Sequence, residues 1–560
     1  MDTQVDVRMT LNYIIDSSTE RFGDLQAIGM AMKEPYTYRN FHRRILALAL
    51  KLQKEGVSKG DRVAILAENS DCWGMAYLAI VRLGAIVVPI LPDLPESDVR
   101  HILSEMKVDI IFTTQRQLEK LYEFSDNLKG PVVSLDDGDS IAGTLDVTPF
   151  SSFVETALKE FEELEAPPEF ETVEEEDIAS ILYTSGTSGH SKAVMLSHKN
   201  LTANAYAASS LADVKPGSVW LSILPMSHTY EFTCGFVLPL LCGARIAYAG
   251  KTPTPAILQK LCEHEKPWAI FAVPLVLEKI YKKRVQPQIK KSKALSLAYK
   301  TNFGRKLIHK RIGKKLIEFF GGNLGLMGIG GAALNPEVEQ FLHEANFPYL
   351  IGYGMTESAP LIAGGPLEDK SIAVSSTGKP IPGTEVKIVD PDPETGLGEI
   401  FVNSPSVMQG YYNDKEETDK VLSEDRWLAT GDLGRFDDEG NLYVCGRLKN
   451  IIVMANGENV YPEIIEHKIN SFQWVLESLV VEKNNTLEAW VYPDYEYVDE
   501  QTSGRSGQER RELIEKFLEE IRDALNKDLS KASRIAKVHE RREPFMKTAT
   551  HKIKRYLYEV

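Results

Sequence analysis

Residues 183–192 read Tyr183-Thr184-Ser185-Gly186-Thr187-Ser188-Gly189-His190-Ser191-Lys192 and follow the apolar segment 178–182. The apolar segment predicts a strand, and the polar run predicts the loop after it. Backbone N–H groups, hydroxyl donors and an ammonium in one loop suit a polyphosphate, and glycine lets the backbone approach it closely. The run lacks the Walker A spacing G-x-x-x-x-G-K-[ST]. An ordinary Ser/Gly-rich turn is the alternative interpretation.

Length and composition indicate a large acidic protein. The chain has 560 residues, of which 43% are hydrophobic, so more than one domain is expected. A net charge of −16 argues against general nucleic-acid binding. The five cysteines are scattered, without a disulfide framework or a C-x-x-C spacing, which favours a reducing compartment. We see neither a signal-peptide pattern nor a typical transmembrane run, so we expect a cytoplasmic protein.

Strand and helix patterns alternate early in the chain. Residues 37–54 predict a helix, 61–67 a strand, the residues from 71 onward a helix, and 84–91 another strand. This alternation favours parallel α/β layering. After residue 447 the pattern is that of a smaller α+β unit. We therefore predict two domains, 1–448 and 449–560, with the boundary near Lys449.

Residues 279–315 are strongly basic in this acidic chain. They contain fourteen Lys and Arg and no Asp or Glu, and apolar residues recur among them at helical spacing. The pattern predicts basic amphipathic helices. They could form a solvated helical face, or a surface for an anion such as a membrane lipid, a cofactor phosphate or an acidic protein.

Four further strings suit nucleotide chemistry. In Gly352-Tyr353-Gly354-Met355-Thr356-Glu357, the tyrosine offers a flat face to a purine, the threonine hydroxyl can bind an α-phosphate oxygen, and the glutamate offers a hard oxygen to Mg²⁺. Gly330-Gly331-Ala332-Ala333-Leu334 has small residues against which a ligand can lie. In Trp427-Leu428-Ala429-Thr430-Gly431-Asp432 and Gly446-Arg447-Leu448-Lys449, Asp432 can accept hydrogen bonds from ribose hydroxyls and Arg447 can donate to the same region.

The C-terminal string Lys547-Thr548-Ala549-Thr550-His551-Lys552-Ile553-Lys554-Arg555 offers a cation to such a site. A lysine can stabilise charge that develops on a carboxylate and an α-phosphate during attack. A basic tail is the alternative. A turn with a structural glutamate is likewise the alternative for the string that contains Glu357.

In this order and spacing, the strings resemble the motifs of the adenylate-forming (AMP-binding) superfamily. The run 183–192 resembles YTSGTTGxPKGV, with Ser191 in place of Pro and Ala193 in place of Gly. The C-terminal string resembles P-K-T-x-x-G-K-I-x-R, with Met546 in place of Pro and His551 in place of Gly. The resemblance extends from Gly60-Asp61-Arg62-Val63 to the C-terminus.

The resemblance implies a large multi-layer α/β domain of the acyl-CoA synthetase/luciferase type and a small mobile α+β C-terminal lid, with the active site between them. It implies catalytic roles for Lys552, Thr356, Glu357 and His228, and a hinge at Lys449. Thr184 and Glu357 are the residues expected near Mg²⁺. The residues expected to bind ATP are Thr184, Ser185, Gly186, Thr187, Ser188, Gly189, Lys192, Gly331, Ala332, Gly352, Tyr353, Asp432 and Arg447.

Two strings narrow the family. Leu224-Pro225-Met226-Ser227-His228-Thr229-Tyr230-Glu231 resembles the L-P-L-x-H-x-x-E string of long-chain fatty acid–CoA ligases, and residues 273–281 resemble their V-P-x-x-x-E-K-I-Y string. The resemblance implies His228 as a wall of the carboxylate site. It implies ATP- and Mg²⁺-dependent activation of a long-chain fatty acid as acyl-AMP, followed by thioester formation with coenzyme A.

Several alternatives stay open on the sequence alone. An acyl carrier protein could replace coenzyme A as the acceptor, and residues 279–315 could dock such an acidic carrier. Luciferase-like oxidation of the adenylate and a non-catalytic nucleotide or lipid sensor are further alternatives. The expected partners are thus a fatty acid and coenzyme A or a carrier protein, with peripheral contact to an anionic membrane through 279–315 and no nucleic acid.

Overall fold

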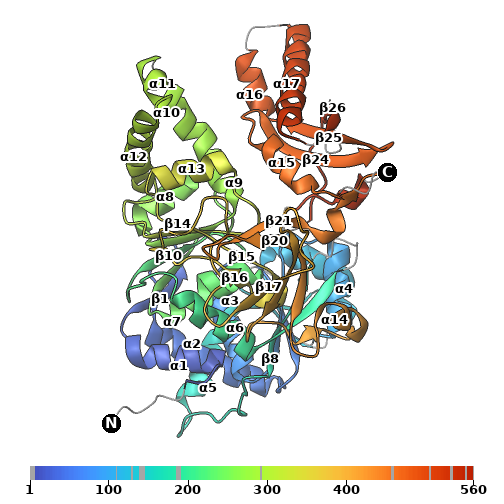
Figure 1. Cartoon of the computed structure of the whole chain (residues 1–560). Coiled ribbons are helices and arrows are strands. Elements are labelled where there is room, and N and C mark those ends of the chain that lie inside the picture. Colours follow the sequence, from blue (N-terminus) through green and yellow to red (C-terminus); the bar gives the residue numbers. More distant parts are fainter. Residues whose placement is uncertain are drawn as a thin grey trace.

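The computed structural model shows a large body from which two projections rise on the same side, a helical arm and a C-terminal lid (Figure 1). The structure describes residues 7–108, 110–127, 130–137, 145–184, 191–290, 293–455, 459–502, 506–529, 534–548 and 552–558. Within these ranges no helix is both long and apolar enough to cross a membrane.

An eight-stranded sheet contains the strand that precedes residues 185–190. Its strands β8, β4, β3, β5, β6 and β7 pair in parallel, and β9 is antiparallel to β8. The order is β19 (Gly410–Tyr411), β9 (Lys192–Ser197), β8 (Ile178–Thr184), β4 (Ile86–Ile90), β3 (Arg62–Leu66), β5 (Ile110–Thr113), β6 (Val132–Ser134) and β7 (Val147–Pro149). The predicted strands at 61–67, 84–91 and 178–182 are confirmed.

A seven-stranded sheet lies beside it, parallel except for its edge strand β2. The order is β14 (Tyr349–Ile351), β13 (Leu326–Ile329), β12 (Ala269–Ala272), β10 (Val219–Ser222), β11 (Arg245–Tyr248), β1 (Gln26–Met30) and β2 (Tyr36–Thr37). The carboxyl ends of parallel strands meet at one edge, where ligands of such sheets bind. The loops that carry His228, Gly331 and Gly352 follow β10, β13 and β14, so this edge collects three predicted motifs.

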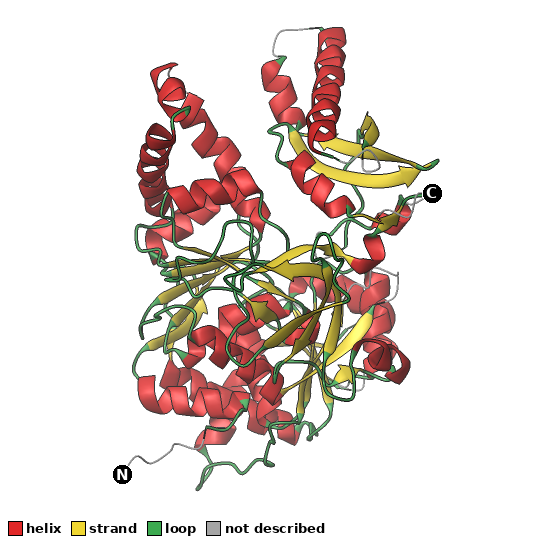
Figure 2. Ribbon diagram, in the orientation of Figure 1, coloured by secondary structure: helices red, strands yellow, loops and turns green. Residues whose placement is uncertain are grey.

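Helices fill the space around the two sheets (Figure 2). The largest core packs helical side chains such as Trp73, Phe41 and Phe236 against both sheets. The helix predicted at 37–54 and the one from residue 71 are confirmed as α2 and α3. These helices are α1 (Leu11–Phe22), α2 (Tyr38–Lys54), α3 (Asp71–Arg82), α4 (Glu96–Met106), η1 (Gln115–Asn127), α5 (Phe150–Glu162), α6 (His198–Ser209), η2 (Glu231–Val237), α7 (Leu238–Leu241), α8 (Pro255–Glu265), α13 (Pro336–Glu344) and α14 (Lys415–Val421).

A four-stranded antiparallel sheet leads toward the lid. Its order is β17 (Glu385–Val389), β18 (Gly398–Asn403), β20 (Leu428–Phe436) and β21 (Leu442–Arg447). The register pairs Asp432 with Arg447, so the two residues expected to bind ribose face each other across neighbouring strands. The short strands β15 (Tyr353–Gly354) and β16 (Leu361–Ala363) and the turn η4 (Thr356–Ser358) lie close to this sheet.

The chain beyond β21 forms a separate core from residues such as Trp474, Val491 and Ile521. Two-stranded and three-stranded sheets pack with helices there, as an α+β unit. Its elements are η5 (Leu448–Asn450), β22 (Ile452–Val453), β23 (Asn459–Val460), α15 (Pro462–Asn470), β24 (Val475–Lys483), β25 (Thr486–Pro493), α16 (Tyr495–Gln501), α17 (Gly507–Asp528), β26 (Ile535–Glu540) and η6 (Arg555–Leu557). We call residues 449–560 the C-terminal lid.

The basic segment forms the helical arm, as its pattern predicted. The arm consists of α9 (Pro274–Ile280), η3 (Tyr281–Val285), α10 (Gln286–Lys290), α11 (Lys293–Tyr299) and α12 (Asn302–Phe319). Ile312 and Leu316 are buried, as expected for an apolar helix face. By contrast, Leu297 is 69%, Phe303 83% and Leu307 61% exposed. Apolar residues at helical spacing therefore pack into the core at the base of the arm and are exposed at its tip.

Candidate functional site

The loop after β10 carries His228 and is anchored by a buried asparagine. The Asn69 amide donates to the carbonyl of Leu224 at 2.5 Å and accepts from the backbone N–H of Met226 at 2.8 Å. The His228 Nδ1 accepts the backbone N–H of Tyr230 at 3.3 Å, so the neutral ring carries its proton on Nε2. Burial, followed by the Lys552 charge, lowers the pKa of His228 to about 4. His228 can therefore act as an uncharged donor at neutral pH.

Glu357 lies buried between elements that are distant in sequence. The Tyr411 hydroxyl donates to Glu357 Oε1 at 3.0 Å, a contact that no local sequence pattern indicates. Burial, with the Glu357 charge as the next cause, raises the pKa of Tyr411, so this hydroxyl keeps its proton. Because Oε1 accepts this hydrogen bond, Oε2 of the Glu357 carboxylate is the oxygen left for a hard cation such as Mg²⁺. The described ranges contain no group of three or more His, Cys, Asp or Glu placed to hold a metal.

Asp432 is held by two partners. Arg447 Nε donates to Oδ1 at 2.9 Å, and the Tyr353 hydroxyl donates to Oδ2 at 2.8 Å. Each oxygen has a further lone pair that could accept a ribose hydroxyl. Tyr353 is buried, and its hydrogen bond to Asp432 is not evident from the sequence. A cavity of ≈ 240 Å³ lined by Gly431, Arg447, Leu448 and Lys449 adjoins this pair.

Lys552 reaches this region from the end of the lid. Lys552 is an exposed residue, yet desolvation of its ammonium, followed by the Arg447 charge, lowers its pKa, while Asp432 and Glu357 act in the opposite direction. The structure thus brings four predicted residues from different parts of the chain into electrostatic range. They are Glu357, Asp432, Arg447 and Lys552.

The run 183–192, predicted to bind phosphate, is described only at its two ends. Thr184 ends β8, and its hydroxyl donates to the Lys192 carbonyl at 3.4 Å. Lys192 Nζ pairs with Glu417 Oε2 of α14 at 2.7 Å and lies 4.6 Å from the centre of the Tyr411 ring. Lys192 is therefore close to the residue that holds Glu357. Ser185, Gly186, Thr187, Ser188 and Gly189 lie outside the described residues.

The remaining predicted residues line the loops at the sheet edge. Gly331 has a φ of 85°, a left-handed conformation that favours glycine. Gly331 and Ala332 are exposed, and Gly352 and Thr356 are half-buried. Lys449 is exposed in the turn η5, immediately after β21.

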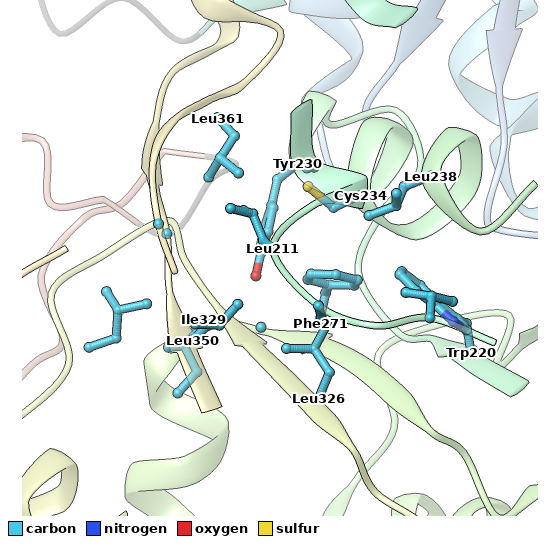
Figure 3. A pocket seen from close by; sticks show the side chains of 17 residues that line it. Leu211, Trp220, Tyr230, Cys234, Leu238, Phe271, Leu326, Ile329, Leu350 and Leu361 are labelled. Carbon is cyan, nitrogen blue, oxygen red and sulfur yellow. The ribbon is translucent and has the colours of Figure 1, made fainter. Parts of the chain in front are cut away.

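An apolar cavity of ≈ 50 Å³ lies beside Gly352. It extends between the seven-stranded sheet and the helices that pack against it. Figure 3 shows Tyr230, Phe271 and Trp220 bordering it, with Leu361 at one end of this view and Trp220 at the other. A Cβ on Gly328 would lie 2.2 Å from Phe271, so the glycine makes room for that wall. No local sequence pattern indicates this cavity, because its lining residues are typical of an ordinary protein core.

This combination of fold and site suits an enzyme that binds a nucleotide beside an apolar ligand. Residues 15–412 match the family described as "AMP-binding enzyme". The 3-[(3aS,4S,7aS)-7a-methyl-1,5-dioxo-octahydro-1H-inden-4-yl]propanoyl:CoA ligase of Rhodococcus jostii (strain RHA1) is 30% identical, over 83% of this chain and 84% of the relative. A long-chain-fatty-acid–CoA ligase of Rattus norvegicus is 28% identical, over 82% and 67%. The solved anthranilate CoA ligase AuaEII, in complex with anthranoyl-AMP, has a TM-score of 0.79 at 20% identity, over 99% of this chain and 98% of that one.

The chain belongs to the AMP-binding enzyme family. Together with its CoA-ligase relatives, this membership indicates an AMP-forming acid–thiol ligase. Such an enzyme uses ATP and Mg²⁺ to convert a carboxylic acid into an acyl adenylate, which then forms a thioester with coenzyme A. The predicted superfamily and fold are thereby confirmed.

Proposed function

We propose that this chain activates a long-chain fatty acid as acyl-AMP and transfers the acyl group to coenzyme A. The observation that carries the choice of acid is the apolar cavity, which reaches the nucleotide motif at Gly352 and is lined almost wholly by hydrocarbon and aromatic side chains. An acyl chain there removes apolar surface from water at about 25 cal/mol per Å². The relative from Rattus norvegicus, named for long-chain fatty acids, supports the same choice.

We assign the roles as follows. His228 donates from Nε2 to the carboxylate of the acid, Lys552 stabilises charge on the attacking carboxylate and the α-phosphate, and Thr356 binds an α-phosphate oxygen. Asp432 and Arg447 hold the ribose, and Gly331, Ala332, Gly352 and Tyr353 border the adenine. Residues 184–189 and Lys192 hold the departing pyrophosphate. Thr184 and Glu357 would hold Mg²⁺, which would supply positive charge to the phosphates.

We further propose that the chain divides at 448/449 and that Lys449 is the hinge. Rotation of the lid about it would withdraw Lys552 after adenylation and let one site serve both half-reactions. Coenzyme A is our proposed acceptor, and an acyl carrier protein is the alternative. A bicyclic propanoate is a second candidate acid, since the relative from Rhodococcus jostii is named for one.

The test is pyrophosphate exchange with ATP and a series of acids from C2 to C18, together with a bicyclic propanoate. We expect exchange to be fastest with fatty acids. A rate that is high only with the bicyclic acid would favour the second candidate. No exchange with any acid would leave a non-catalytic sensor as the better interpretation.

Trp220 should set the preferred chain length. The cavity volume of ≈ 50 Å³ is far below the roughly 300–1,000 Å³ of ordinary ligand pockets, so a long chain requires a side chain to move. Trp220→Leu should shift the optimum of the exchange assay toward longer acids. Trp268→Leu is the matched control. The ring centres of Trp268 and Trp220 lie 6.3 Å apart, but Trp268 does not line the cavity. Equal profiles for both variants and the wild type would contradict this role.

We also propose that the tip of the arm contacts an anionic membrane, from which a fatty acid could enter. Phe303, Leu307, Lys310 and Lys314 recur at helical spacing on α12, and all four are exposed. Such a face suits the boundary between headgroups and acyl chains. Each lysine near an anionic bilayer contributes about 1 kcal/mol, and this attraction is screened by salt. The protein would then be cytoplasmic with a reversible peripheral contact.

Co-sedimentation with phosphatidylglycerol and phosphatidylcholine vesicles tests the contact. We expect salt-sensitive binding to the anionic vesicles only, and a loss of at least fivefold for Lys310→Gln/Lys314→Gln and for Phe303→Ser/Leu307→Ser. Equal binding to both vesicle types would contradict the proposal. Normal vesicle binding by these variants, with activity lost only toward a carrier protein, would assign the face to carrier docking.

A further inference from the structure

Asn335 joins two helices that belong to different parts of the molecule. Its Oδ1 accepts the backbone N–H of Glu337 at 2.9 Å and so caps the N-terminus of α13. Its Nδ2 donates to the carbonyl of Asn470 at 3.2 Å. Asn470 is the last residue of α15 in the lid. The final carbonyls of a helix have no partner inside the helix, so this amide satisfies one of them. Asn335 immediately follows the string 330–334.

The neighbouring turn of the arm contacts the same side of the lid. Lys282 Nζ donates to the carbonyl of Val475, the first residue of β24, at 2.9 Å. Lys283 Nζ pairs with Glu496 Oε2 of α16 at 2.9 Å. The Asp494 charge also acts on both lysines. Cations of the arm thus face acids and carbonyls of the lid, and we call Lys282, Lys283 and Asn335 the lid dock.

The segment 273–281 holds Asn335 in place. Glu278 Oε1 accepts the backbone N–H of Asn335 at 3.1 Å and so fixes the residue whose side chain reaches Asn470. Lys282 follows one helical turn after Glu278. The segment therefore sets the position of the lid dock on the body.

We propose that the lid dock holds the lid in the orientation that brings Lys552 to the site, and that Asn335 and Lys282 are positioning residues for adenylation. This inference rests on the proposed function with its two half-reactions. A contact made in one orientation only shifts the population toward that orientation by its own free energy. Loss of the dock should therefore slow the step that needs Lys552 and spare the step that follows rotation.

Asn335→Asp separates this role from a structural one. Asp caps a helix N-terminus as well as Asn does, so α13 keeps its cap, while the donor to Asn470 becomes an acceptor facing a carbonyl. We expect pyrophosphate exchange to fall about tenfold, with thioester formation from supplied acyl-AMP and coenzyme A unchanged and the thermal unfolding midpoint within error. An equal fall in both half-reactions, or none in either, would overturn the proposal.

Charge exchange across the dock provides a second, independent measurement. Lys283→Glu should lower the rate of pyrophosphate exchange. Lys283→Glu combined with Glu496→Lys should restore this rate, because the ion pair is rebuilt with opposite polarity. Lys260→Glu, an exposed lysine of α8, is the matched control and should change neither half-reaction. Failure of the double variant to recover would count against the dock. Absence of exchange in the wild type would instead refute the proposed function.

Discussion

Lys552→Ala should lower acyl-adenylate formation by about 10²–10³-fold, the loss typical when one preorganised electrostatic stabiliser is removed. Lys552 is in electrostatic range of Glu357, Asp432 and Arg447, although it comes from the far end of the chain. Alanine carries no charge that could replace this ammonium. Pyrophosphate exchange measures the first half-reaction, and thioester formation from supplied acyl-AMP measures the second.

The second half-reaction should be spared, because the lysine serves only the orientation in which it faces the site. Lys554→Ala is a suitable control two residues along, since it removes a lysine from the same string. Equal loss of both half-reactions in Lys552→Ala would make the lysine structural or exclude the alternation of the lid. Loss in both lysine variants alike would indicate a general effect of the basic tail.

Glu357→Gln should weaken the use of Mg·ATP at least as much as the about 10–100-fold loss typical for outer partners of a metal site. The amide keeps the shape of the side chain, and its oxygen can still accept the Tyr411 hydroxyl at Oε1. Only the negative charge is lost, so the fold should be retained. The measurement is exchange rate against Mg²⁺ concentration at fixed ATP and acid.

Tyr411→Phe is the informative companion to Glu357→Gln. It removes the donor that orients Glu357 and leaves the charge, so we expect a smaller change in the Mg²⁺ dependence. An unchanged Mg²⁺ dependence in Glu357→Gln would remove this carboxylate from the metal role. A larger effect in Tyr411→Phe than in Glu357→Gln would mean that orientation matters more than charge.

The sequence by itself determined the local structure and the superfamily. The strands β3, β4 and β8 and the helices α2 and α3 follow from short-range apolar periodicity, which depends on neighbours a few residues apart. The site motifs could be recognised for a similar reason. Each combines glycine, hydroxyl and charged residues at fixed spacing within one loop, and these residue types together indicate ligand binding. The exposed apolar tip of the arm shows the limit of periodicity, since Phe303 and Ile312 lie on one helix with opposite burial.

Only the tertiary structure decided what lies across from each motif. The bonds from Tyr411 to Glu357, from Tyr353 to Asp432 and from Asn335 to Asn470 join residues separated by 54, 79 and 135 positions. No local pattern encodes such pairs, because they arise from the order of the strands and the placement of the lid. The apolar cavity depends on tertiary structure in the same way. Its walls come from several strands and helices, and each lining residue alone is typical of a protein core.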